Sequence, residues 1–241
     1  MTTTTMAYLT NATLFRQPAT VTGIGTDEKG NFIITNTTPA YAQGGGQEAD
    51  NGIIISASGI SHFNDVRFFE GSVKHYLQNG LDQFIVGTTL EIIVDEKRRK
   101  RNSILHSAGH LVASVAFKNV SNLTPMKGHH FIDGSYVELC GELNGNSDEI
   151  KIILQHILNK EIQTEKVVSY EMVTAEELKL KCPFIQPGLP IDKPLRVVSI
   201  ESYFPMGCGG THIQRLNEIP ILHITKIKSN KGVVRISYSC F

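Results

Sequence analysis

The stretch Arg99–Val115 reads R-K-R-N-S-I-L-H-S-A-G-H-L-V-A-S-V and predicts an amphipathic helix. Its apolar side chains recur at the helical repeat of about 3.6 residues, so they form one stripe that a core can cover. The stripe consists of Ile104, Leu105, Ala108, Leu111, Val112 and Val115. His106 and His110 lie one turn apart on the other side, in line with Arg99, Ser103 and Ser114. Such a helix can present two imidazoles as half of a metal site.

A second segment raises the case for a metal, because two histidines at this spacing can occur by chance. A zinc peptidase helix carries a glutamate directly after its first histidine, and Ser107 stands there instead, which argues against a peptidase. Met206–His212 (M-G-C-G-G-T-H) offers a cysteine and a histidine at ligand spacing, with glycines that allow a tight loop. Three imidazole nitrogens and one thiolate suit zinc. We therefore expect Zn²⁺ to be bound by His106, His110, Cys208 and His212.

Length and composition indicate a folded protein with one large or two modest domains. The chain has 241 residues, of which 41% are hydrophobic, enough to fill a core. Its 23 basic and 23 acidic residues balance, so contact with a nucleic acid must depend on local patches. The four cysteines lack a disulfide-rich spacing, and neither a signal peptide nor a membrane-length apolar run is visible. We expect a cytoplasmic protein without membrane contact, either monomeric or a small homo-oligomer.

The order of the predicted elements indicates an α+β fold. Short β-like runs separated by turns suit a small barrel or a bent antiparallel sheet. These runs are Leu14–Phe15, Ala19–Thr22, Phe32–Thr35, Ile53–Ser56, Phe84–Val86 and Leu90–Val94. Helices follow at 147–159 and at 174–180, where Thr174 is the predicted N-cap, and strands follow at 195–200, 219–227 and 232–238. We expect a β-barrel-like domain at 1–94, then an α+β domain at 95–241 with an antiparallel sheet and the zinc-bearing helix.

The segment Thr38–Asp50 contains three consecutive glycines, Gly44, Gly45 and Gly46, followed by Gln47. Such glycines supply positive φ angles or a close backbone approach, and their N–H groups can form an anion-binding nest. The alternative is an ordinary flexible turn, because glycine-rich turns are common. The segment matches neither the dinucleotide fingerprint nor the phosphate-binding loop, so no nucleotide cofactor is indicated.

A run of basic residues, Lys97–Arg101, falls in the first two turns of the predicted helix, after a possible N-cap at Asp95. Cations at a helix N-terminus are disfavoured by about 0.3–1 kcal/mol each, so the run calls for an explanation. One explanation is a bound polyanion near the histidines, contacted by Arg98 and Arg99. The other is a solvated charged face beside Asp95 and Glu96.

A hairpin is predicted at residues 128–139, where two β-like runs meet at Asp133-Gly134. His129 and His130 stand at the start of its first strand, so only one of them can point toward a given cavity. Either could contact a metal ligand or a substrate, but we expect a surface position.

Two motifs in this sequence resemble those of a known family. His-Ser-Ala-Gly-His at 106–110 and Cys-Gly-Gly-Thr-His at 208–212 are similar to the metal motifs of the editing domain of alanyl-tRNA synthetase and of its freestanding relatives, the AlaX proteins. Thr37–Gly52 also looks like the family's Gly-Gly-Gly-Gln…Asp-x-Gly segment. Asp95 with its arginine pair, the strand at 195–200 and the last hairpin extend the resemblance. It covers most of the chain in the family's order.

The resemblance implies a zinc-dependent aminoacyl-tRNA deacylase. Its substrate would be the ester that joins a wrong amino acid, typically serine or glycine, to the 3′ end of the alanine tRNA. With both domains assigned, no residues remain for amino-acid activation, so we expect action in trans on a charged tRNA. Two alternatives stay open. One is editing of another tRNA, because the threonyl-type editing domain has similar paired motifs, and the other is a non-enzymatic RNA-binding protein with structural zinc.

Residues beside the expected ligands are candidates for the chemistry that the resemblance implies. Ser107 and Thr211 carry hydroxyls that could hold the attacking water. The amides of Gly209 and Gly210 could donate to negative charge developing on the carbonyl oxygen. The candidate tRNA contacts are Arg98, Arg99, Gly44, Gly45, Gly46 and Gln47.

The chain departs from the family's usual pattern at three positions. Ser107 replaces the usual threonine but keeps a hydroxyl. Gly109 replaces a bulkier residue, which weakens the helix by up to ~1 kcal/mol and changes the floor of the pocket. Met126 stands where the synthetase tends to have glutamine. These departures bear on substrate preference more than on metal binding.

Overall fold

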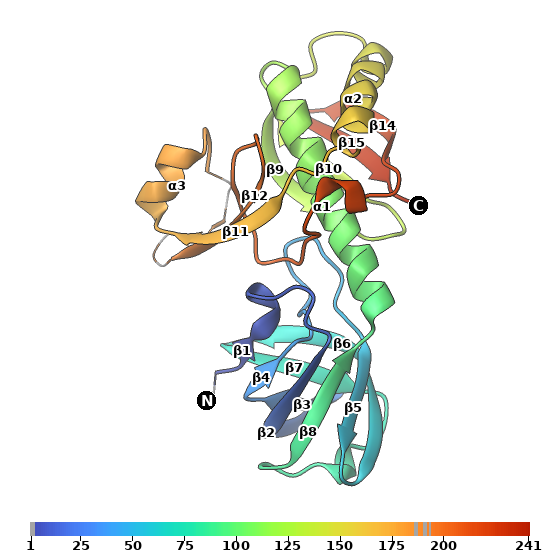
Figure 1. Cartoon of the computed structure of the whole chain (residues 1–241), viewed down its shortest axis with the longest axis vertical. Helices are drawn as coiled ribbons and strands as arrows, with labels where there is room; N and C mark the ends of the chain where they lie inside the picture. The colour runs from blue at the N-terminus through green and yellow to red at the C-terminus, as the bar shows by residue number, and fades with distance from the viewer. Residues whose placement is uncertain (1–2, 186–187, 190–191, 193) are drawn as a thin grey trace. The chain divides into compact units, whose positions relative to one another are not determined.

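The computed structural model describes residues 3–185, 188–189, 192 and 194–241. They form two compact units, Met1–Arg101 and Asn102–Phe241, each of which is described by itself (Figure 1). The division falls inside the long helix α1 (Glu96–Asn119), so the basic run belongs to the first unit and the histidines to the second. Among the described residues, no helix has both the length and the apolar character needed to span a membrane.

The first unit is built around a closed six-stranded barrel whose neighbouring strands are all antiparallel. In barrel order the strands are β2 (Arg16–Asp27), β3 (Gly30–Thr35), β7 (Ser72–Leu77), β6 (Gly59–Phe69), β5 (Gly52–Ser56) and β8 (Thr89–Val94). Outside the barrel, β1 (Thr5–Met6) pairs in parallel with β4 (Thr37–Thr38), and η1 (Ala7–Leu9) and η2 (Leu81–Gln83) are short 3-10 helices. The barrel expected from the β-like runs is confirmed.

Alternate side chains fill the barrel, because successive residues of a strand point to opposite faces. Its buried centre includes Ile33, Ile54, Phe63, Val66, Val73 and Ile92. The β6–β7 hairpin was not predicted, because a register shift between Phe63 and Asp65 changes the phase of the alternation. The strand predicted at 84–86 was wrong. Phe84 packs in the core, but Ile85 and Val86 are exposed in the loop before β8.

Carboxylates neutralise the basic run at the start of α1. Asp95 acts as the predicted N-cap, since its Oδ1 accepts a hydrogen bond from the Arg98 backbone N–H at 3.0 Å. Arg98 and Arg101 lie 3.0 and 3.6 Å from the same Glu48 carboxylate oxygen. These ion pairs offset the unfavourable interaction of the two arginines with the helix dipole.

Arg99, one of the predicted tRNA contacts, is buried and bound within the first unit. Its side chain is only 1% exposed and is held by an ion pair with Asp50, in which Nε donates to Oδ2 at 2.9 Å. Its terminal nitrogens also donate to the backbone carbonyls of Ala12 and Pro39, at 2.9 and 2.5 Å. A guanidinium used in this way is a structural clamp between α1 and the loop that precedes β5.

In the described part of the second unit there are two antiparallel sheets and three α-helices. The four-stranded sheet has the order β14 (His223–Asn230), β15 (Val233–Ser239), β10 (Tyr136–Cys140) and β9 (Thr124–His129). The three-stranded sheet has the order β11 (Val168–Val173), β12 (Leu195–Ile200) and β13 (Met206–Gly207). With α1 stand α2 (Ser147–Glu161), α3 (Ala175–Lys181) and the short 3-10 helix η3 (Leu216–Glu218). Thr174 forms a capping box on α3, as predicted for that N-cap. The α+β class is confirmed.

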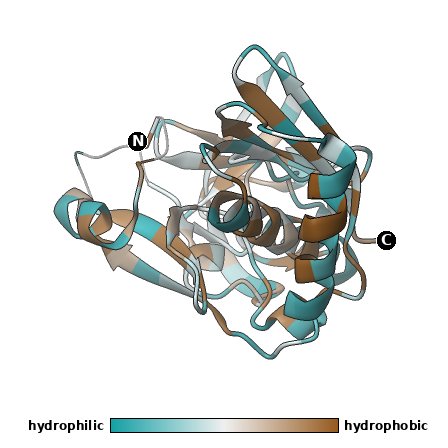
Figure 2. Cartoon of the chain, turned by 90° about the horizontal axis from the view of Figure 1, so that it is seen from above, coloured by the Kyte–Doolittle hydropathy of each residue, from teal (hydrophilic) through white to brown (hydrophobic). Residues whose placement is uncertain are grey.

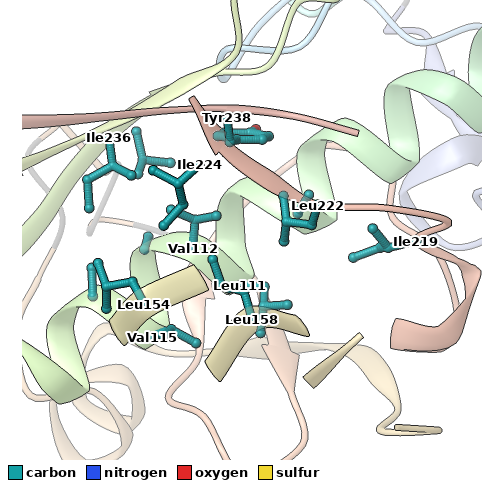
Figure 3. Close-up of a cluster of buried hydrophobic side chains, with 14 of the residues drawn as sticks. Leu111, Val112, Val115, Leu154, Leu158, Ile219, Leu222, Ile224, Ile236 and Tyr238 are labelled. Carbon is teal, nitrogen blue, oxygen red and sulfur yellow. The ribbon is translucent and has the colours of Figure 1, made fainter. Parts of the chain in front are cut away.

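A shared core fixes α1 in the second unit (Figure 3). Leu111, Val112 and Val115 of α1 lie among Leu154 and Leu158 of α2 and the sheet residues Ile224, Ile236 and Tyr238. The outer helix α2 shows both hydrophobic and hydrophilic residues along its length (Figure 2). Because α1 is packed on this side, His106 and His110 are held in a defined position on its other side.

Candidate metal centre

Four predicted ligands come together in the second unit, although they lie about a hundred residues apart in sequence. His106 and His110 extend from α1, and Cys208 and His212 come from the loop after β13. The ligand atoms of all four lie within 4.8 Å of one another. Sγ of Cys208 is 3.4 Å from Nε2 of His106 and 3.3 Å from Nε2 of His212. This compact N₃S set could hold one metal ion in the tetrahedral geometry typical of zinc.

Backbone contacts explain why the loop turns toward α1. β13 pairs with β12, and the Cys208 N–H then donates to the Arg196 carbonyl at 3.0 Å. Nη1 of Arg196 in turn donates hydrogen bonds to the carbonyls of Cys208 and Gly210, at 2.6 and 3.1 Å. The Gly210 N–H donates to Sγ of Cys208 at 3.3 Å. The strand and its arginine therefore hold the thiol in place.

Two hydroxyls on α1 hold the other end of the loop. Oγ of Ser107 lies 3.0 Å from Nδ1 of His212 and accepts the Ile213 N–H at 3.2 Å. Oγ of Ser103 lies 2.8 Å from Oγ1 of Thr211. Ser107 and Thr211 are fully buried, so the structure gives these two candidate catalytic residues contacts within the protein. Their contacts hold the loop that carries Cys208 and His212 against α1.

His130 is a residue of the site that sequence reasoning placed on the surface. It is 3% exposed, and its ring stacks on that of His106 with centroids 4.4 Å apart. The Tyr238 hydroxyl donates to the Leu105 carbonyl at 2.8 Å, and it lies 2.7 Å from Nδ1 of His130. Because that hydroxyl proton is already used, Nδ1 must carry the proton shared with Tyr238. Burial lowers the pKa of His130 to about 3, so it is a neutral imidazole at pH 7, packed against a predicted ligand.

Two glycines make room for His130. A Cβ at Gly109 would lie 2.3 Å from Cε1 of His130, and a Cβ at Gly128 would lie 2.3 Å from its Nε2. Any larger side chain at either position would displace the ring. The unusual Gly109 in the first motif therefore has a packing reason, and it was the sequence signal that could have pointed to a bulky neighbour.

Burial dominates the electrostatics of the cluster. Desolvation, with smaller contributions from neighbouring groups, lowers the pKa of His106 and His212 well below the usual value and that of His110 to about 4. The same burial raises the pKa of the Cys208 thiol to about 11. The imidazoles are therefore neutral at pH 7 and can act as ligands, whereas the thiol needs a nearby cation to ionise.

A buried nitrogen without a partner also fits a bound zinc ion. Nδ1 of His110 is buried and has no hydrogen-bond partner among the residues that the structure describes. A buried polar atom without a partner costs about 1–3 kcal/mol, so such atoms usually mark a missing partner. Cys208 is partly exposed and Gly209 is exposed, so the cluster meets solvent at this edge of the loop.

The other predicted residues lie in the first unit. Gly44 and Gln47 form a β-bridge, and the Tyr41 hydroxyl donates to the Gly44 carbonyl at 2.7 Å. Gly45 and Gly46 between them have φ angles of 53° and 78°, which favour glycine. The segment is therefore an ordered tight turn.

The chain matches two family models. Residues 4–98 match the family described as tRNA synthetases class II (A). Residues 195–237, which include Cys208 and His212, match the family described as Threonyl and Alanyl tRNA synthetase second additional domain.

Curated relatives align with most of the chain. An alanine–tRNA ligase of Archaeoglobus fulgidus is 29% identical over 96% of this chain and 25% of its own length. That of Methanosarcina mazei is 30% identical over 87% of this chain and 23% of its own length. The alanine–tRNA ligase of Shewanella amazonensis is 26% identical over 80% of this chain and 22% of its own length. The chain thus spans about a quarter of the length of these relatives.

Proposed function

Because the chain is an AlaX-like relative of the alanyl-tRNA synthetase editing domain, we propose that it is an aminoacyl-tRNA deacylase. Its substrate is tRNA(Ala) mischarged with serine or glycine, and it cleaves the ester at the tRNA 3′ end in trans. The observation that carries this proposal is the convergence of His106, His110, Cys208 and His212 within 4.8 Å, at an edge of the protein that meets solvent. A hydrolytic centre needs both features.

The proposed cofactor is Zn²⁺, held by these four side chains. When bound, zinc supplies a Lewis acid that can position the amino group or the terminal ribose of the substrate. The neutral imidazoles suit it, and Ser107 and Arg196 keep His212 and Cys208 in ligating positions. The alternative that stays open is a structural zinc, which would stabilise the fold but support no hydrolysis.

The chain's own groups supply the remaining functions in this proposal. The Gly209 N–H is the better amide donor for the developing carbonyl oxyanion, because Gly209 is exposed whereas the Gly210 N–H already donates to Sγ of Cys208. Ser107 and Thr211 act by holding the ligand loop. An ester of a tRNA ribose is labile, so orientation beside such donors provides much of the rate.

The test measures amino-acid release from charged tRNA. Purified protein is given seryl-, glycyl- and alanyl-tRNA(Ala), and seryl-tRNA(Thr) to examine the threonyl-type alternative. We expect release of serine and glycine from tRNA(Ala), little release of alanine, and loss of activity in Cys208→Ala or after chelation and dialysis. Wild-type protein that binds one equivalent of zinc and releases no amino acid above the Cys208→Ala rate would refute the deacylase and favour the structural-zinc alternative.

A further inference from the structure

One face of the three-stranded sheet continues from the metal centre to the protein surface. In the β11–β12 pair, Tyr170 stands opposite Val198 and Met172 stands opposite Arg196. Residues directly opposite one another in an antiparallel pair point to the same face, so these side chains share one side of the sheet. Tyr170 is 45% exposed and Met172 is 59% exposed, an unusual pair of large apolar side chains on an edge strand.

Arg196 connects this surface to the ligand loop. Its guanidinium carbon lies 4.8 Å from the centroid of the Tyr170 ring, within the range of a cation–π contact. Its Nη1 donates to the carbonyls of Cys208 and Gly210. The ring of Tyr170 is therefore separated from the Cys208 loop by a single side chain. The guanidinium also places positive charge beside a site proposed to bind a tRNA end.

The opposite face of the same sheet packs in a core at its α3 end. Val173 and Leu195 pack there with Leu178 of α3 in a separate small core. The face that carries Tyr170 is the one that also carries Arg196, whose guanidinium contacts the Cys208 loop. Figure 1 shows β11 and β12 between α3 and the α1 side of the unit.

We propose that Tyr170, Met172 and Arg196 form a stacking platform for the adenine of the tRNA 3′-terminal adenosine. The inference rests on the proposed deacylase function. The scissile ester and the adenine belong to the same nucleotide, so a base platform must lie beside the hydrolytic centre. Aromatic rings bind bases through their π-faces, and a guanidinium adds attraction to the negatively charged backbone. The continuity with the Cys208 loop and the charge of Arg196 favour a nucleotide as the occupant.

The experiment compares Tyr170→Ala with Tyr170→Phe, and it uses Leu180→Ala on the exposed side of α3 as the matched control. Two probes are used with the whole chain: seryl-tRNA(Ala) for kcat and KM, and a non-hydrolysable 3′-serylamido-adenosine for the Kd. An analogue of the second probe without the base reports what the adenine contributes.

Tyr170→Ala is expected to raise KM and Kd on the order of tenfold, which corresponds to about 1.4 kcal/mol, with kcat nearly unchanged. Tyr170→Phe and Leu180→Ala should behave like wild type, because the ring remains or the site is untouched. The wild-type preference for the adenine-bearing analogue should disappear in Tyr170→Ala.

The design distinguishes a failure of the platform from a failure of the deacylase. Active wild-type protein with equal KM and equal base preference in Tyr170→Ala and Leu180→Ala would overturn the platform and leave the deacylase intact. Protein that releases no serine but binds the adenosine analogue, with Tyr170→Ala weakening it, would overturn the deacylase and support the platform.

Discussion

Nδ1 of His212 lies 3.0 Å from Oγ of Ser107, the residue that follows His106 on α1. This contact joins the two motifs of the metal centre directly. The same Oγ accepts the Ile213 N–H, so a single hydroxyl fixes both the ring of His212 and the backbone that follows it. With Nδ1 engaged, Nε2 faces Sγ of Cys208 at 3.3 Å.

Ser107→Ala should therefore weaken zinc binding without unfolding the protein. Loss of a group that orients a ligand typically reduces metal affinity by about 10–100-fold. The measurement is competition for Zn²⁺ with a chromophoric chelator. Ser114→Ala is the matched control on the same helix, because Oγ of Ser114 is buried without a partner among the described residues. Equal zinc affinity in Ser107→Ala and Ser114→Ala would show that Ser107 does not support zinc binding.

Gly109→Ala should destabilise the second unit, although alanine favours a helix by about 1 kcal/mol. The added Cβ would lie 2.3 Å from Cε1 of His130 and 2.7 Å from the Tyr238 hydroxyl. Overpacking of this kind costs about 1–3 kcal/mol, which exceeds the gain in propensity. Urea unfolding of the protein gives the free energy of unfolding.

The control for this steric argument is a double variant. In a His130→Ala background the destabilisation caused by Gly109→Ala should be smaller than in the wild type, because the clashing ring is absent. Gly134→Ala, where a new Cβ meets nothing within 4 Å, should be nearly neutral. A Gly109→Ala protein that is more stable than wild type would show that His130 can move away.

Asp50→Asn should strongly destabilise the barrel unit. The carboxylate is fully buried, pairs with Arg99 and accepts the Tyr41 N–H at 2.7 Å. Removing one charge leaves a buried guanidinium without its counter-ion, at a cost of about 3–5 kcal/mol. The double variant Asp50→Leu/Arg99→Met should lose less, because it leaves no unpaired charge. Thermal and urea unfolding measure the stability of each variant. If the losses of the single substitutions simply add in the double variant, the ion-pair argument is contradicted.

His75 should make the barrel unit less stable in mild acid. It is fully buried, and desolvation lowers its pKa from 6.5 to about 4. A histidine whose folded pKa is depressed stabilises the protein above pH 6.5 and loses that contribution as the pH falls toward 4. By this linkage, about 2 kcal/mol should be lost between pH 7.5 and pH 5. The measurement is the free energy of unfolding at both pH values.

His75→Phe is the comparison for the pH effect, since it keeps a ring but cannot titrate. It loses contacts at 2.8 Å to the Thr38 hydroxyl and at 3.4 Å to the Ile33 carbonyl, so it will be less stable than the wild type at pH 7.5. Its dependence on pH should nevertheless be smaller than that of the wild type by about the same 2 kcal/mol. Identical pH slopes would assign the titration to other groups.

Local sequence determined several parts of this protein. The apolar stripe of α1 predicted its packing, Asp95 and Thr174 predicted two helix starts, and the paired spacings predicted which four side chains meet. The helix features depend on residues within one or two turns of one another, and the ligand set depends on side chains that bind the same metal. Such information is present in the order of the residues.

Tertiary structure decided the rest. Arg99 faces the barrel loop and Asp50 instead of a ligand, and His130 lies against His106 instead of at the surface. The phase change at the β6 bulge hid a whole hairpin of the barrel. In each case the outcome depends on a partner that is remote in sequence, such as Tyr238 for His130 or Asp50 for Arg99. Periodicity assigns a side chain to a face of its own element, but only packing decides what covers that face.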